Sequence, residues 1–400
     1  MTSKENRSRL IELMFVVLVS TVVGMVSGGA AIFTMLDVKE PEYSYVENNS
    51  DLSEVNSVYE DIISKYYKVV DKDALITGAI DGMISVLGDP NSSYFDNEEA
   101  ASFNDRLNGK YVGVGLEIMA DGTGKILVVG IFEGSPASKS KIKEGDYILE
   151  VDGVPVSGIT AEETASKIKR ELGEEAVLTI ERDGETFKET IASGNIVIKS
   201  VESQIFKKNN KNVGYIKLDI FAANTEEQFI EELKKLEKQK INSLIIDVRN
   251  NSGGYLTSVT DILERFLPKG TILYKTRDAE GTIDRFDTTS EKRSYKVVVL
   301  TNEVSASASE ILAVTLSEKY GAILVGKKTY GKGTVQQVLN TASGGFAKIT
   351  TQEWLSPEGN EIDKVGVVPK YDVDMDYNKY DPAKAETDTQ LQKALEVIVK

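Results

Sequence analysis

The chain contains no cysteine and no histidine. Without cysteine it can form no disulfide, no thiolate nucleophile and no cysteine-ligated metal site. Without histidine it can form no Ser-His-Asp triad, no Cys-His pair and no histidine-bound zinc site. Any nucleophilic catalysis must therefore use another base, and lysine is the usual substitute.

Basic residues are also in the minority. Against 63 Asp and Glu there are 47 Lys and Arg, which gives a formal net charge of −16. A nucleic-acid partner is not expected, because phosphates require lysine and arginine patches. Solubility alone would also account for the acidic excess. The length of 400 residues exceeds what one hydrophobic core usually serves, so we expect two or three domains.

A long apolar run without charge occupies residues 13–36 and is long enough to cross a bilayer core of about 30 Å. Basic residues precede it and acidic residues follow it: Lys4, Arg7 and Arg9 on one side, Asp37, Glu40 and Glu42 on the other. The positive-inside rule then predicts a single-pass anchor in the cell membrane, with a cytoplasmic N-terminus and an extracytoplasmic bulk. The small residues at 27–31 leave a cleaved signal peptide as the alternative.

The rest of the chain changes character twice. Residues 51–107 have helical spacing of apolar residues, and residues 111–193 have short β-rich runs between glycine turns, with one helix expected at 161–172. The remainder alternates between the two kinds of element, which predicts an α/β layer with parallel strands. We expect strands at 213–218, 243–248, 297–301, 323–325 and 333–338, and helices at 226–239, 256–267, 307–320 and 389–399.

Ser307 is the first candidate for catalysis. It lies in the segment SASASE at 305–310, where an apolar strand turns into a helix. The N–H groups at the start of a helix favour a developing oxyanion. Ser307 and Glu310 also have the spacing of a capping box, so a purely structural role remains open from this segment alone.

Lys332 is the second candidate, in the segment Gly331-Lys332-Gly333. A lysine acts as a base only when neutral, so burial must lower its pKa from about 10.4 towards 7. In a strand, Lys332, Thr334 and Gln336 would share a face, and Gln336 could orient the amine without adding charge. A surface lysine in a glycine turn is the alternative.

A third segment, DVRNNSGG at 247–254, follows a buried strand. Its glycines could form a simple tight turn, or they could present N–H groups to an oxyanion. Asp247 and Arg249 are interpreted as structural.

Two further motifs are rejected. Residues 326–332 match the first seven positions of a phosphate-binding P-loop, but Gly333 replaces the magnesium-binding hydroxyl residue and a strand-like run follows. The S-x-x-K spacings at 138–141 and 166–169 lack the S-D-N and K-T-G segments of penicillin-recognising enzymes, so we interpret them as chance.

Together the three candidate segments resemble the carboxyl-terminal processing peptidases, over essentially the whole soluble chain. Lys332 follows Ser307 by 25 positions, the spacing in that family, which selects Ser307 over Ser305 and Ser309. The resemblance implies that Ser307 is the nucleophile, Lys332 the general base and Gln336 the residue that positions the lysine. It also implies oxyanion donors, expected to be the N–H groups of Ala308 and of Gly253 or Gly254.

Residues 111–193 look like the PDZ module that these peptidases carry. The resemblance implies that a loop binds the C-terminal carboxylate of a peptide, which would add as a strand beside residues 115–119. The loop residues are Tyr111, Val112, Gly113, Val114, Gly115 and Leu116. Family members often have an arginine after the isoleucine of the 161–172 helix, thought to couple peptide binding to catalysis. Here Lys169 stands there and Arg170 follows, and lysine lacks the bidentate fork of arginine.

The resemblance implies a multidomain α/β protein, with a ClpP/crotonase-like peptidase core, an inserted PDZ domain and a helical N-terminal region. The expected divisions are a stub and anchor at 1–37, a tether at 38–50, a helical dimerisation region at 51–108, a PDZ domain at 109–194, a Ser-Lys peptidase core at 195–370, and a tail and helix at 371–400.

The expected function is that of a serine endopeptidase that captures protein C-terminal tails and cleaves them by a Ser-Lys acyl-enzyme mechanism at the outer face of the membrane. It would need no cofactor, neither metal nor nucleotide, and would form a homodimer. A catalytically inert, membrane-tethered PDZ scaffold is the alternative, although both Ser307 and Lys332 are present. A lipid-binding protein on a crotonase-like fold rests on fold analogy alone.

Overall fold

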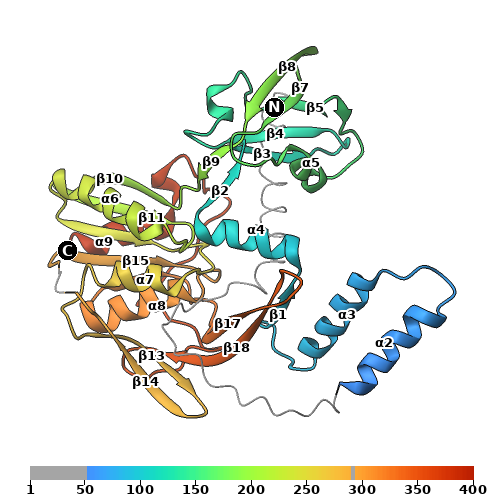
Figure 1. Ribbon diagram of the computed structural model, residues 1–400. Coiled ribbons are helices and arrows are strands. Elements are labelled where there is room, and N and C mark those ends of the chain that lie inside the picture. Colours follow the sequence, from blue (N-terminus) through green and yellow to red (C-terminus); the bar gives the residue numbers. More distant parts are fainter. Residues whose placement is uncertain (1–51, 290–292) are drawn as a thin grey trace. The chain divides into compact units, whose positions relative to one another are not determined.

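The computed structural model describes residues 52–289 and 293–400, which divide into two compact units (Figure 1). Of the described residues, the first unit comprises 52–102, 201–289 and 293–400, and the second comprises 103–200. The predicted anchor and tether lie outside the described residues. Among the described residues, no helix is long and apolar enough to cross a membrane.

A six-stranded sheet forms the centre of the first unit, in the order β10-β11-β12-β15-β16-β19. All neighbours from β11 to β19 are parallel, and β10 pairs antiparallel with β11 at one edge. The strands are β10 (Val201–Lys208), β11 (Lys211–Leu218), β12 (Ser243–Asp247), β15 (Lys296–Thr301), β16 (Ile323–Gly326) and β19 (Tyr371–Asp372). Because both faces of this sheet are covered, β12 and β15 are buried almost throughout and have apolar residues in the middle.

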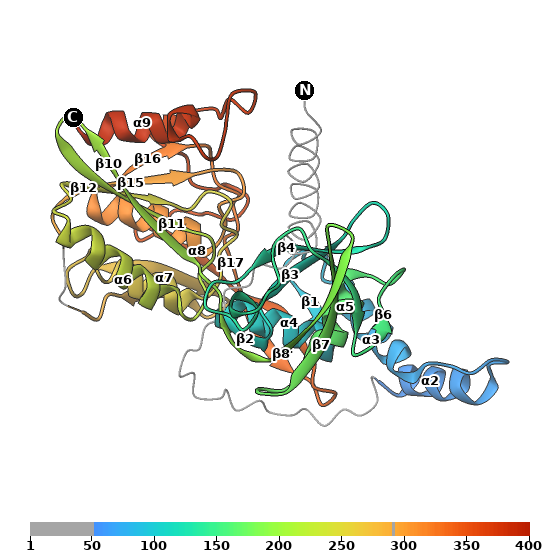
Figure 2. The same cartoon turned by 90° about the horizontal axis from the view of Figure 1, so that it is seen from above.

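Helices cover the two faces of this sheet (Figure 2). On one face lie α6 (Thr225–Lys238), α7 (Leu256–Leu263) and α8 (Ala308–Thr315), and on the other lies α9 (Thr389–Ile398). The predicted helix at 307–320 is present, but its second half is not α-helical. There α8 gives way to a π-helical turn, η2 (Leu316–Tyr320), before Gly321 ends it in a left-handed conformation.

A second, antiparallel sheet in the first unit is built from β1, β13, β14, β17 and β18. Its strands are β1 (Ser93–Phe95), β13 (Ile272–Asp278), β14 (Gly281–Phe286), β17 (Thr334–Asn340) and β18 (Phe346–Leu355). Only β17 corresponds to a predicted strand. In β18 the polar side chains of Lys348 and Thr350 obscure the apolar pattern on which a strand prediction depends.

The second unit contains a six-stranded antiparallel sheet in the order β3-β4-β5-β7-β8, with β6 beside β5, and a separate β2-β9 pair. The elements are β2 (Lys110–Gly113), β3 (Leu116–Ala120), β4 (Ile126–Ile131), η1 (Ala137–Lys139), β5 (Tyr147–Val151), β6 (Val154–Pro155), α5 (Ala161–Ile168), β7 (Glu175–Arg182), β8 (Glu185–Ala192) and β9 (Gly194–Val197). It has its own core, separate from the two cores of the first unit.

The remaining helices are α2 (Ser53–Lys65), α3 (Lys72–Ser85), α4 (Asn97–Asn108) and the short η3 (Ala385–Thr387). Neither α2 nor α3 has a buried residue. Both therefore present apolar side chains to solvent, among them Val55, Val58, Ile76 and Met83.

Candidate active site

Three loops of the first unit meet at the carboxyl-terminal ends of the parallel strands. They follow β12, β15 and β16, and the carboxyl ends of parallel strands lie on the same side. These loops carry the three segments that the sequence singles out, around residues 253, 307 and 332. The topology therefore brings the three candidate segments together.

Ser307 sits at the turn between β15 and α8 in a strained backbone conformation. Its φ of 59° and ψ of −116° lie in a region that costs a non-glycine residue about 1–3 kcal/mol. The side chain is completely buried, and its Oγ makes no hydrogen bond within the described chain. Only one arm of a capping box forms, because Glu310 Oε2 accepts from the N–H of Ser307 at 2.8 Å while the serine hydroxyl caps nothing. Capping therefore does not explain the hydroxyl.

Glu310 joins the serine turn to the lysine loop. Its Oε2 also accepts from the N–H of Lys332 at 2.9 Å, so the main-chain nitrogens of Ser307 and Lys332 share one acceptor atom. Its Oε1 accepts from Gly331 N–H at 2.7 Å and from Thr329 Oγ1 at 2.5 Å. Burial raises the pKa of Glu310, and these four hydrogen bonds act in the opposite direction. The sequence alone predicts only a capping role for Glu310.

Lys332 is buried, with 2% of its surface exposed, and its Nζ has no hydrogen-bond partner among the described residues. Burial lowers the pKa of Lys332 to about 7, and the charge of Lys348 acts in the same direction. Asp89 and Glu310 act against this shift without cancelling it. The amine has the properties that a neutral base requires, although no hydrogen bond joins it to the Oγ of Ser307.

Gln336 lies at the start of β17 and is fully buried. Its Nε2 donates to the hydroxyls of Thr334 at 2.8 Å and Thr350 at 3.1 Å, and its Oε1 has no partner in the part of the chain described. The predicted alternation from Lys332 to Gln336 is wrong, because β17 begins only at Thr334 and is irregular between Val335 and Gln336. No hydrogen bond joins the amide to Lys332.

The glycine loop packs directly against the serine turn. A Cβ on Gly253 would lie 2.9 Å from the Cβ of Ser307, so only glycine allows this approach. The N–H of Gly253 donates to Asn251 Oδ1 at 2.8 Å and is therefore occupied. Within the described residues the N–H groups of Gly254 and Ala308 make no hydrogen bond. Of the two predicted glycine donors, Gly254 is thus the one available to an oxyanion.

A buried ion network holds the base of this loop. Arg249 donates to Asp247 Oδ2 at 2.6 Å and to Asp388 Oδ2 at 2.8 Å. Asp388 also caps α9 by accepting from the N–H of Leu391 at 2.8 Å. The network links the loop after β12 to the C-terminal helix, which agrees with the structural interpretation of Asp247 and Arg249.

The second unit contains the predicted peptide-binding loop between β2 and β3. Gly115 has φ +83°, and a Cβ there would lie 2.2 Å from the Cβ of Ser135. The N–H groups of Val114 and Gly115 donate to no acceptor in the described parts of the chain. Because β3 is at the edge of its sheet, one side of it can accept an added strand.

The remaining residues of this loop support its shape. Tyr111 and Val112 lie in β2 and Leu116 begins β3, while Val114 is buried in the core. Gly113 lies so close to the ring of Tyr111 that a Cβ would be 2.7 Å from it. Burial, followed by the charges of Glu117 and Asp105, raises the pKa of Tyr111 to about 12.

Lys169 and Arg170 lie beyond α5, because the predicted helix 161–172 ends at Ile168. Lys169 takes up an extended conformation with ψ 130°. Its Nζ lies 3.8 Å from Asp105, and Arg170 pairs with Asp152. Both partners belong to the second unit.

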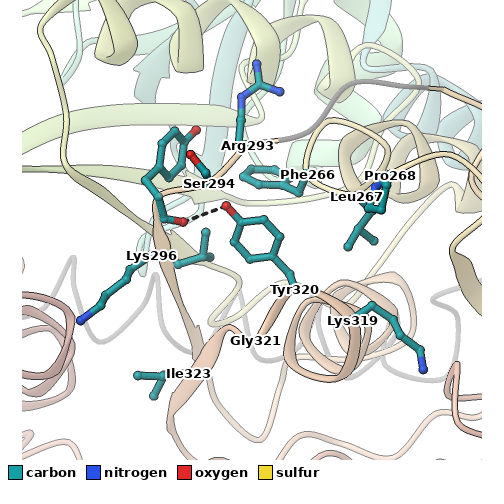
Figure 3. Close-up of a pocket in the computed structure, with 12 residues that line it drawn as sticks. Phe266, Leu267, Pro268, Arg293, Ser294, Lys296, Lys319, Tyr320, Gly321 and Ile323 are labelled. Carbon is teal, nitrogen blue, oxygen red and sulfur yellow. Dashed lines mark hydrogen bonds between the residues drawn. The ribbon is translucent and has the colours of Figure 1, made fainter.

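A hollow of about 440 Å³ lies elsewhere on the first unit, beside the start of β15 and β16 (Figure 3). Phe266 and Tyr320 line it, and the hydroxyl of Tyr320 donates to the carbonyl of Tyr295 at 2.8 Å. Because the candidate residues follow the opposite ends of these strands, this hollow is not part of their site. Among the described residues, no group of three or more carboxylates is placed to hold a metal ion.

Three models of known protein families match parts of this chain. Residues 212–373 match the model of peptidase family S41, residues 24–99 that of the activating protease CtpB N-terminal domain, and residues 102–181 that of the PDZ domain. The carboxy-terminal processing protease CtpB of Bacillus subtilis is 37% identical, over 86% of this chain and 75% of its own length. CtpA of the same organism is 32% identical, over 93% of this chain and 79% of its own length.

A solved structure from Bacteroides fragilis, assigned to the S41 proteases, has a similar fold. It superimposes with a TM-score of 0.50 at 17% identity and covers 80% of this chain and 90% of its own.

Proposed function

The chain belongs to peptidase family S41, as a carboxy-terminal processing serine protease with a PDZ domain, and on this premise we propose that it cleaves through a Ser307–Lys332 pair. One observation carries the proposal. The amine of Lys332 is buried without a hydrogen-bond partner in the described chain, in a loop that Glu310 fixes to the turn of Ser307. Such an amine can be neutral near pH 7 and accept a proton.

In the proposed reaction the Oγ of Ser307 attacks the carbonyl carbon of the scissile peptide, and its proton passes to the Nζ of Lys332. The N–H groups of Ala308 and Gly254 would bind the resulting oxyanion at the start of α8. The C–N bond then breaks as Lys332 returns the proton to the leaving amine. Water hydrolyses the serine ester in a second, equivalent step. The two side chains must approach to about 2.6–3.2 Å in the complex with substrate, a closure common in enzymes whose free form has a longer separation.

Gln336 would act through its free Oε1, which can accept a hydrogen bond from the amine of Lys332 without holding it protonated, as a carboxylate would. In the second unit, the loop from Tyr111 to Leu116 would bind the C-terminal carboxylate of a substrate tail through the N–H groups of Val114 and Gly115. The tail would pair with the free edge of β3.

The test uses a reporter protein with an unstructured C-terminal tail. Ser307→Ala and Lys332→Ala should each abolish its cleavage by the full-length chain and leave binding of the tail peptide intact. An exchange outside the site, Lys379→Ala, should retain full activity, because that lysine is 81% exposed. Full activity in the Ser307 or Lys332 variant would contradict the proposal. Binding without cleavage in the unmodified chain would favour an inert scaffold.

We also propose a homodimer and a membrane anchor. The homodimer is supported by the exposed apolar side chains of α2 and α3, which a second copy would cover. Sedimentation as a monomer at micromolar concentration would contradict it.

The anchor is supported by the apolar run at 13–36 and the charges that flank it. Digestion of intact cells by an added protease should remove the domains beyond the anchor. Resistance of these domains until the cells are lysed would contradict an outer location.

A further inference from the structure

Lys348 is a second fully buried lysine near the candidate site. It lies in the middle of β18, with none of its surface exposed, opposite Val338 of β17 and Ser93 of β1. Lysine is almost never fully buried in a protein unless its charge has a use or a partner. The proposed reaction gives Lys348 no role.

The two sheet strands place Lys348 on the face that carries Gln336. Lys348 and Thr350 are two positions apart on β18 and therefore point to the same side. Thr350 is opposite Gln336 and accepts its hydrogen bond at 3.1 Å. Lys332 is tied to the same strand, because Trp354 Nε1 donates to its carbonyl at 2.8 Å. Lys332 is thus anchored to the strand that carries Lys348, and the charge of Lys348 lowers the pKa of Lys332.

Two carboxylates from different parts of the chain act on this pair of lysines. Glu310 approaches from α8 and acts on Lys332, whereas Asp89, from the segment before β1, acts on both lysines. Asp89 is held by Ser92 Oγ at 2.6 Å and by the N–H of Asn91 at 2.9 Å. Ser92 Oγ also accepts from the N–H of Thr350 at 3.0 Å, which fixes the carboxylate segment to β18.

The surroundings favour the charged form of Lys348 over that of Lys332. The Nζ of Lys348 lies 5.1 Å from the ring centre of Phe95, a separation at which an ammonium is attracted to the ring face. Burial lowers the pKa of Lys348 to about 8 and that of Lys332 to about 7. Two ammonium ions near each other in a buried site repel, and the ring of Phe95 favours Lys348 as the one that stays charged.

We propose that Lys348 is a positioning residue whose ammonium, stabilised by the ring of Phe95 and by the charge of Asp89, keeps the neighbouring amine of Lys332 unprotonated and ready to take the proton of Ser307. The inference rests on the proposed Ser307–Lys332 mechanism. A neighbouring cation is an established means of making a lysine nucleophilic or basic at neutral pH.

The test is the pH dependence of kcat/KM of the full-length chain between pH 5.5 and 9.5, with one tailed peptide as substrate. In the unmodified chain the activity should rise with a midpoint near pH 7. Lys348→Met should move the midpoint up by about one pH unit, lowering activity at pH 7 about fivefold and restoring it by pH 9. Lys348→Arg keeps the positive charge and should keep the midpoint. Lys379→Met also removes one positive charge, but from a solvent-exposed side chain, and should leave the pH profile unchanged.

A uniform loss of activity in Lys348→Met, with an unmoved midpoint, would show a merely structural role and overturn the inference. If that variant does not fold, NMR of the lysine Cε signals in the Ser307→Ala chain, followed as a function of pH, shows which of the two lysines is charged. Lys348 must be charged at the pH where Lys332 is neutral, and a neutral Lys348 there contradicts the inference. Cleavage that survives Lys332→Ala would instead overturn the proposed function.

Discussion

Lys332 differs from the buried Arg249 because no described carboxylate binds its side-chain nitrogen directly. Arg249 is also buried, but Asp247 and Asp388 both bind it directly. The Nζ of Lys332 has no hydrogen-bond partner in the described chain, so its charged form is not compensated. The same burial that lowers the pKa of the amine therefore costs stability.

Lys332→Met should stabilise the fold while it abolishes activity. The pKa of Lys332 is about 7 in the folded chain and 10.5 for an unperturbed lysine, so the unfolded state binds more protons between these values. Stability of the unmodified chain should then rise with pH from about 7 to 10.5. The variant should lose this rise and gain about 1–3 kcal/mol in free energy of unfolding at pH 7, measured with urea. A less stable variant would contradict the account.

Glu310→Gln should disturb both candidate residues at once. The carboxylate accepts from the main chain of Ser307 and Lys332, and an amide would turn a donor towards one of these N–H groups. We expect a loss of about 2–3 kcal/mol in unfolding free energy and a lower kcat. Glu303→Gln, an exposed change in the same loop, is the control. If the two variants had the same unfolding free energy and the same kcat, Glu310 would not link Ser307 to Lys332 as described.

At the scale of elements, the apolar strands were the predictable part. The run at 297–301 is β15, because a strand covered on both faces has no polar positions. From parallel strands it follows that the loops around Gly253, Ser307 and Lys332 share an edge. The second sheet was not predictable, since β18 carries Lys348 in a position that only tertiary packing makes buried. The positive φ of Ser307 was likewise not predictable, because serine seldom adopts it.

Asp388 should prove as important as the residues of the glycine loop that it helps to hold. It caps α9 and binds Arg249 at the base of that loop. Asp388→Ala would leave the guanidinium buried with one partner fewer, at a cost of about 3–5 kcal/mol. The melting temperature and kcat should both decrease. Asp381→Ala should change neither, because Asp381 is 40% exposed and its ion pair lies on the surface. An unchanged kcat in Asp388→Ala would show that α9 does not position the loop.

At the scale of the whole molecule, binding and chemistry are assigned to different units. The second unit has its own core, and the glycine turns of 111–193 indicated such a module from the sequence. The sequence spacing also predicted the apolar faces of residues 51–107, but a single chain cannot reveal what covers them.

Gly115→Val should abolish tail binding and leave the peptidase unit reactive. The added Cβ would lie 2.2 Å from the Cβ of Ser135, at a φ of +83° that valine avoids. Fluorescence polarisation with a C-terminal peptide measures the loss. Gly122→Val is the matched control, because nothing lies within 4 Å of its Cβ. Tail binding that survives in the Gly115 variant would place the carboxylate site elsewhere.

The most direct test of the Ser307–Lys332 pair is the rate at which a fluorophosphonate probe labels Ser307 as a function of pH, followed by mass spectrometry of the labelled peptide. This reaction needs the activated hydroxyl but no substrate tail. The account predicts labelling that rises with a midpoint near pH 7 and disappears in Lys332→Met. Labelling that is independent of pH from 5.5 to 9, or that persists without Lys332, would contradict it.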